Sequence, residues 1–145
     1  MVFLSQQDPR WVNYKYNGNY TLGRYGCTIT DITMFYDWAF NKNVTPDWVA
    51  SKLKFSNGLL LWNSISNIGL KFVYRYYSRN DNRIKQALNS ANEGCLLQVN
   101  KNHWLFLIGR YIPGLGWKVA DPWTGKSCYT KKYNNNITGF AVISR

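Results

Sequence analysis

Apolar residues recur every three or four positions along the segment that begins at Cys27, which is the spacing of an amphipathic helix. The stripe consists of Ile29, Ile32, Phe35 or Tyr36, and Ala39 or Phe40. We expect the two acidic residues of this segment, Asp31 and Asp37, to lie on its solvent-facing side. The pattern therefore predicts a long helix that begins close to Cys27.

Three further helices are predicted before position 92. The segment NVTPDWVASKL offers Thr45 as an N-cap and Pro46 as the first helical residue, and its pattern runs to about Lys54. The segment LWNSISNIGL predicts a short helix that ends at Gly69. Residues 80–91 again carry apolar side chains at helical spacing.

Alternating positions rich in aromatic and β-branched residues dominate the second half of the chain. They predict strands at 71–77, 95–99, 103–111, 116–121, 138–144 and, more weakly, 127–133. Helices thus precede an antiparallel sheet, an order typical of an α+β fold with separate layers. Without an internal repeat or a low-complexity linker, we predict one domain over residues 1–145.

Composition predicts a packed, basic protein. Hydrophobic residues make up 46% of the 145 positions, which excludes a disordered chain. Eighteen Lys and Arg against seven Asp and Glu give a net charge of +11, which favours attraction to polyanions such as nucleic acid, wall polymers or anionic lipid. A generally basic surface is the plainer interpretation, because no run of five like charges occurs.

The N-terminal segment MVFLSQQDPRW has neither a basic region nor an apolar run of the kind that a secretory signal contains. No apolar stretch reaches the ~20 residues that a membrane span needs. We therefore expect synthesis in the cytoplasm without a signal peptide, and no membrane span.

The three cysteines are expected to be reduced thiols. Cys27, Cys95 and Cys128 cannot all pair with one another, and no Cys-x-x-Cys motif is present. A zinc site would have to gather these three residues and His103 from four separate segments. We therefore expect no metal and no other cofactor.

Cys27 directly follows Gly26 at the start of the first predicted helix. Unpaired backbone N–H groups and the helix dipole at such a position favour a thiolate. The same N–H groups can hold an oxyanion that forms when the sulfur attacks a carbonyl. By residue type alone, a small buried structural thiol is the more common interpretation.

His103 and Asp121 lie near the same end of a predicted hairpin. Symmetric folding about the IPGLG connection sets Tyr111 opposite Trp117 and Leu107 opposite Asp121. In that register His103 overshoots Asp121 by four residues. A β-bulge, or an Asp121 beyond the regular pairing, must close this gap.

If the gap closes, Asp121 can hold one ring nitrogen of His103 and leave the other facing Cys27. A structural histidine and an Asp that only forms a turn before proline remain the alternatives. The combination of a thiol at a helix start, a histidine at a strand start and an Asp at a strand end makes nucleophilic catalysis an equally open interpretation.

Four segments, in order along the chain, resemble the C39-like type of papain-like cysteine peptidases. They are LSQQDPRW, YTLGRYGCTITDITMFYDW, VTPDWVASKL and NHWLFLIGRYIPGLGWKVADPWTG. The resemblance implies the papain-like architecture, in which N-terminal helices pack on a C-terminal antiparallel sheet.

The resemblance also implies a set of site residues. Cys27 matches the nucleophile, His103 the general acid and base, and Asp121 the residue that orients the imidazole. Gln6, in the Gln-x-Asp-Pro-x-Trp segment, matches the side-chain amide that completes the oxyanion hole. Its neighbour Gln7 is the alternative donor if the register slips by one, and an exposed N-terminal glutamine without a role is the plainer interpretation.

These observations predict a cysteine peptidase or amidase that hydrolyses peptide bonds. Peptides of the bacterial cell wall are the preferred substrate, and the protein would be phage-encoded and associated with the virion. Two other classes stay open. One is a C39-like module without turnover, such as a structural component of a phage particle; the other is a basic nucleic-acid-binding protein.

Overall fold

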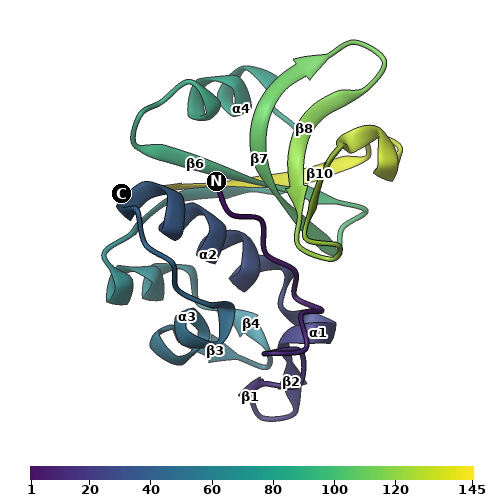
Figure 1. The fold of residues 1–145 in the computed structure, drawn as a ribbon. Coiled ribbons are helices and arrows are strands. Elements are labelled where there is room, and N and C mark those ends of the chain that lie inside the picture. The colour runs from purple at the N-terminus through teal and green to yellow at the C-terminus, as the bar shows by residue number, and fades with distance from the viewer.

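A six-stranded antiparallel sheet, in the order β5-β10-β6-β7-β8-β9, forms the centre of the fold in the computed structural model, which describes residues 1–145 (Figure 1). Its strands are β5 (Lys71–Tyr76), β6 (Glu93–Val99), β7 (His103–Ile112), β8 (Gly116–Asp121), β9 (Lys126–Tyr129) and β10 (Ile137–Ser144). The predicted α+β class, with helices packed on an antiparallel sheet, is confirmed.

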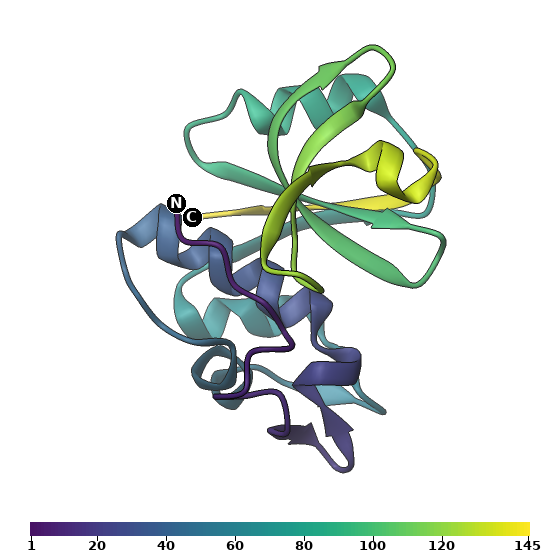
Figure 2. The same ribbon diagram turned by 45° about the vertical axis from the view of Figure 1, so that its right-hand side comes forward.

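Helices cover both faces of this sheet. The helix α2 (Cys27–Phe40) packs on one face and α4 (Asp81–Leu88) on the other, as the two views show (Figures 1 and 2). Along β6, Leu96 belongs to the core under α2 and Leu97 to the core under α4, because alternate side chains of a strand point to opposite faces. Both leucines are fully buried.

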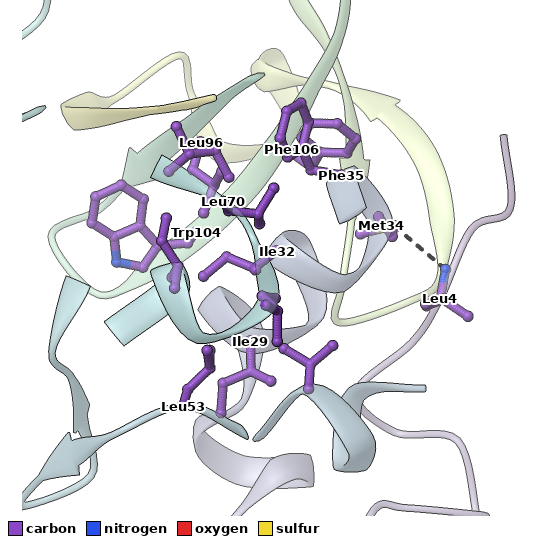
Figure 3. Close-up of a cluster of buried hydrophobic side chains, with 14 of the residues drawn as sticks. Leu4, Ile29, Ile32, Met34, Phe35, Leu53, Leu70, Leu96, Trp104 and Phe106 are labelled. Atoms are coloured by element: carbon purple, nitrogen blue, oxygen red, sulfur yellow. Dashed lines mark hydrogen bonds between the residues drawn. The ribbon is translucent and has the colours of Figure 1, made fainter. Parts of the chain in front are cut away.

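The core between α2 and the sheet holds the start of α2 in place. Figure 3 shows Ile32 and Phe35 of α2 among Leu70, Trp104 and Phe106. Burial of each such apolar side chain contributes on the order of 2 kcal/mol. The N-terminal segment also crosses α2, where the Leu4 backbone N–H donates to Met34 Sδ at 3.5 Å (Figure 3).

The expectation that Asp31 and Asp37 face solvent is wrong. Asp31 has no exposed surface and Asp37 is buried. The apolar stripe identified one face of α2 correctly, but the sheet and the N-terminal segment cover further faces of the helix. Asp37 accepts a hydrogen bond from the Val44 backbone N–H at 2.9 Å, whereas both carboxylate oxygens of Asp31 lack a partner.

The remaining predicted helices are present with shifted ends. The helix α3 (Pro46–Lys52) starts at the predicted proline, and α4 begins after Asn80, whose side chain caps the backbone N–H of Arg83. The third helix is the 3-10 helix η1 (Trp62–Ile68). It ends at Gly69, which has a φ of 84° that favours glycine.

Several short elements were not predicted. They are β1 (Lys15–Asn17), β2 (Tyr20–Thr21), α1 (Leu22–Tyr25), β3 (Phe55–Ser56), β4 (Leu59–Leu60) and the 3-10 helix η2 (Thr130–Tyr133). Strands of two or three residues are too short to show a period. The predicted strand 127–133 is split between β9 and η2. None of the helices combines the length and the hydropathy that a membrane-spanning helix requires.

The register of the β7–β8 hairpin brings Asp121 toward His103. Tyr111 pairs with Trp117 as predicted, but Leu107 pairs with Val119 instead of Asp121. The two irregularities in between lie on either side of Gly109. They shift the pairing by two residues, so the expected bulge is present and shortens the overshoot of His103.

Gly109 allows this irregularity because β7 passes very close to β8 there. A Cβ atom at position 109 would lie 2.8 Å from the Cβ of Lys118, which is closer than two such atoms can approach. A larger residue at this position would push the strands apart.

Candidate active site

A cleft of ≈ 1030 Å³ lies between the N-terminal half of the chain and one end of the sheet. Cys27, at the start of α2, and His103, at the start of β7, both line it, and so does Gln6 from the N-terminal segment. Three of the four predicted site residues therefore border one open space, and the fourth, Asp121, lies directly behind His103.

Cys27 is the first residue of α2 and is partly exposed to the cleft. Gly26 separates α1 from α2, and a Cβ at this position would lie 2.5 Å from the carbonyl oxygen of Leu22. Glycine is therefore required where one helix turns into the next. This turn places the sulfur at the N-terminus of a 14-residue helix, where the dipole favours a negative charge.

The His103 ring bridges the cleft and Asp121. Its Nε2 lies 2.9 Å from Asp121 Oδ1, which leaves the other ring nitrogen, Nδ1, outside this contact. Burial by itself would lower the pKa of His103, but the hydrogen bond with Asp121, and then the nearby Cys27, outweigh burial and raise the pKa to about 9. The imidazole is therefore held in its protonated form at neutral pH.

Asp121 ends β8 and has no exposed surface. Besides His103, its carboxylate accepts hydrogen bonds from Lys132 Nζ at 2.9 Å, from the Tyr133 hydroxyl and from the Trp123 backbone N–H at 3.0 Å. Burial alone would raise the pKa of Asp121, but these four donors lower it below its usual value. Asp121 is thus a fixed negative charge behind the imidazole.

Sequence reasoning missed Lys132 and Tyr133 as partners of Asp121. Tyr133 also lies beside the His103 ring, with the ring centroids 5.4 Å apart. Both residues belong to η2, in a segment whose polar, weakly alternating pattern suggested only an exposed strand. The indole of Trp123 is half exposed, and only its backbone contacts the carboxylate.

A second carboxyl group lies beneath the site. Asp31 follows Cys27 by four residues, so that both occupy one side of α2. Burial, and then the negative charges of Cys27 and Asp121, raise the pKa of Asp31 well above its usual value. Asp31 therefore binds its proton more tightly than an exposed carboxyl group does, in contrast to Asp121, whose pKa is lowered.

Gln6 is buried beside the cleft, and its side-chain amide already has acceptors. Its Nε2 donates to the carbonyl oxygens of Gly23 at 3.1 Å and Leu22 at 3.4 Å, and its Oε1 has no partner. Gln7 also donates to the carbonyl oxygen of Gly23, but Gln7 does not line the cleft. The geometry therefore favours Gln6 over Gln7 as the residue that faces a substrate.

The other two cysteines lie apart from this arrangement. Cys95 is buried under α4, and burial strongly raises the pKa of its thiol. Cys128 is half-buried on β9, and burial raises the pKa of its thiol as well. All three cysteines are free thiols, and no group of His, Cys, Asp and Glu side chains is arranged to hold a metal ion.

Comparison with solved structures finds a related fold. The chain superposes on the crystal structure of a double glycine motif protease from an AMS/PCAT transporter in complex with the leader peptide, with a TM-score of 0.57. The match covers 81% of this chain and 83% of that chain, at 19% sequence identity. The chain has a C39-like, papain-like fold.

This likeness concerns the arrangement of the backbone, since identity is low. No protein-family model matches this sequence, and no curated protein matches it either. The structural neighbour is a cysteine peptidase that was crystallised with a peptide. In that neighbour the fold belongs to a protease, and activity in this chain depends on the side chains of its own cleft.

Proposed function

We propose that the protein is a cysteine peptidase or amidase in which Cys27, His103 and Asp121 act as the catalytic triad. The observation that carries the proposal is the contact of Asp121 with His103 Nε2, which leaves Nδ1 for Cys27 in an open cleft. The C39-like fold supports it, because this fold is that of a peptidase. A buried structural histidine would need neither an ionised partner nor a thiol at a helix start.

The proposed reaction begins from a protonated His103 beside the Cys27 thiolate, whose proton has already passed to the imidazole. The thiolate attacks the amide carbonyl carbon, and the imidazolium donates its proton to the leaving nitrogen, which gives a thioester and a free amine. His103 then takes a proton from water, the hydroxide attacks the thioester, and the acid and the Cys27 thiolate are released while His103 keeps the proton. Asp121 holds the ring through both proton transfers.

The developing oxyanion would be held by the Cys27 backbone N–H and the amide of Gln6. Gln6 already donates to two carbonyl oxygens, and the bond to Leu22 is the longer one at 3.4 Å. In the proposed complex, Gln6 exchanges this weaker bond for the oxyanion. Glutamine is suited to the exchange because its second N–H can keep the bond to Gly23.

Alkylation by iodoacetamide tests the proposed nucleophile. Cys27 should react near neutral pH before Cys95 and Cys128, because burial suppresses ionisation of the other two thiols. His103→Ala should slow the reaction of Cys27, and Cys95→Ala, the control, should not. Equal reactivity of the three thiols would favour a C39-like module without turnover.

The natural substrate is proposed to be a peptide of the bacterial cell wall, and the protein a phage-encoded component of a virion. The support comes from the basic composition, at a net charge of +11, and from the resemblance in sequence. A turbidity assay on bacterial cell walls, comparing the wild-type protein with Cys27→Ala, tests this assignment. Lysis that persists in Cys27→Ala would contradict it.

A further inference from the structure

Besides His103, three basic side chains line the cleft, and no acidic side chain does. They are Arg24 of α1, Arg75 of β5 and Lys101 of the β6–β7 turn. None of the three forms an ion pair within the protein. The site therefore presents positive charge that the chain itself leaves without a counter-charge.

The acidic residues of the chain are engaged elsewhere. Three pair with arginines outside the cleft, as Asp8–Arg10, Asp81–Arg79 and Glu93–Arg83. Three others are buried, namely Asp31, Asp37 and Asp121. The seventh, Asp47, lies in the first turn of α3. A negative charge that meets the cleft cations has to come from a bound molecule.

Arg75 is the most constrained of the three cations. Its guanidinium lies 4.4 Å from the ring centre of Tyr77 and 5.0 Å from that of Trp104. Its Nε is buried and has no hydrogen-bond partner. The two aromatic contacts orient the guanidinium plane, while its N–H donors are left without a protein carboxylate.

Trp104 connects Arg75 to the reactive part of the cleft. It directly follows His103 in β7, and its ring packs against Trp62 with the centroids 5.7 Å apart. Trp62, Trp104 and Arg75 all line the cleft that Cys27 and His103 border. A peptide that lies along this cleft would meet a preoriented guanidinium on an aromatic wall.

We propose that the cleft selects peptides that carry a free carboxylate, and that Arg75 is the residue that recognises it. The proposal rests on the proposed peptidase function of the same cleft. A guanidinium matches a carboxylate through two parallel N–H···O bonds, and Arg24 and Lys101 add attraction of the same sign. Arg75 determines specificity, and takes no part in bond cleavage.

Binding to the Cys27→Ala variant tests the proposal without requiring turnover. The probes are fluorescent decapeptides of Gly and Ala with a single Glu at successive positions, each matched by a peptide with Gln there. At one or more positions, the Glu peptide should bind about tenfold more tightly than its Gln partner, as expected for a charge-assisted hydrogen bond. Equal affinities at every position, or no binding at all, would overturn the proposal.

Two arginine variants separate recognition from general charge. Arg75→Gln in the Cys27→Ala background should abolish the preference for Glu, while Arg75→Lys should retain part of it. Arg110→Gln removes the same charge from an exposed position of β7 outside the cleft and should leave the preference intact. A preference that survives Arg75→Gln, or that falls equally in both Gln variants, would overturn the role of Arg75.

A role of Arg75 that is limited to packing against Trp104 predicts a different result. Arg75→Met would then restore the affinity for Glu peptides that Arg75→Gln loses. Under the proposal, Arg75→Met lacks the preference just as Arg75→Gln does. Circular dichroism of both variants checks that the fold is retained.

Turnover by the otherwise unmodified protein distinguishes the source of the carboxylate. One arm uses the best Glu decapeptide and its Gln partner, and the other uses a wall stem peptide with a free glutamate carboxylate and its amidated form. In each cleaved pair, the carboxylate form should have the higher kcat/KM. Equal cleavage of both forms contradicts the carboxylate preference but leaves the peptidase function standing, whereas Glu-selective binding without cleavage of any substrate contradicts only the peptidase function.

Discussion

The Nε2 atom of His103 lies 2.9 Å from Oδ1 of Asp121, although the two residues are 18 positions apart and belong to different strands. Asp121→Asn removes the negative charge that raises the pKa of His103 and holds its ring. We expect kcat/KM for peptide hydrolysis to fall on the order of 10²-fold, the usual scale of general acid–base assistance. Kinetic measurement on a cleaved peptide, at constant pH, checks this.

Asp121→Asn should also alter the dependence of stability on acid. The folded-state pKa of Asp121 is lowered, so its contribution to stability is present above about pH 4 and is lost as the pH falls further. The unfolding temperature of the variant should therefore fall less than that of the wild-type protein as the pH is lowered. Unchanged kinetics together with an unchanged acid profile would contradict an ionised Asp121 behind the imidazole.

His103 is the only histidine of the chain, so that a single NMR resonance reports its protonation. We expect this resonance to titrate at about 9 in the wild-type protein. In Cys27→Ala the pKa should be lower, because the nearby Cys27 is among the causes that raise it. Titration near the ordinary value of 6.5 in both proteins would rule out a coupled thiol and imidazole.

The raised pKa of His103 should make the folded state less stable as the pH rises. The folded state holds the proton more tightly than the unfolded chain, so the stabilisation is complete below pH 6.5 and is lost as the pH rises toward 9. Urea unfolding at pH 6 and pH 9 should show this loss in the wild-type protein. The loss should be smaller in His103→Gln, which does not titrate.

Local signals were sufficient to predict the elements that carry the site. The helix start at Cys27, the proline start of α3 and the glycine end of η1 follow from the backbone preferences of Gly and Pro. The pairing of Tyr111 with Trp117 follows from the symmetry of a short connection. Each of these features depends on residues that are close together in the sequence.

Features that depend on tertiary contacts could not be predicted in this way. A bulge in the hairpin was expected, but its position at Gly109 was not, because it depends on the close approach of Lys118 from the next strand. The four donors of Asp121 come from β7, η2 and the turn after β8, and no periodic pattern connects them. Burial of Asp31 likewise follows from the segments that cover α2, and helical periodicity alone assigned it to solvent.

The contribution of Gln6 can be separated from that of its neighbour. Gln6→Ala should lower kcat on the order of 10²-fold, as expected for loss of one oxyanion donor. Gln7→Ala is the matched control, because it removes a hydrogen bond to the same Gly23 carbonyl without opening the cleft. An equal loss in both variants would mean that the glutamines only support the loop at Gly23.

Asp31 should make the protein less stable as the pH rises. Its pKa is raised in the folded state, first by burial and then by the charges of Cys27 and Asp121. The folded protein therefore keeps a proton that the unfolded chain releases above about pH 4, and stability falls with pH from there upward. Asp31→Asn is neutral at every pH and of similar shape, so we expect it to unfold roughly 3 °C or more above the wild-type protein at pH 8.

The same pair of proteins should unfold at similar temperatures near pH 3.5, where much of the difference in proton binding is gone. Asp8→Asn is a control in which the carboxyl group affects the pH dependence of stability in the opposite direction, because the hydrogen bond from Arg10 lowers the pKa of Asp8. Its effect should be small, since this pair is exposed. If the difference in unfolding temperature between the wild-type protein and Asp31→Asn stayed constant from pH 4 to pH 8, Asp31 would have to be ionised in the folded state and held by a partner.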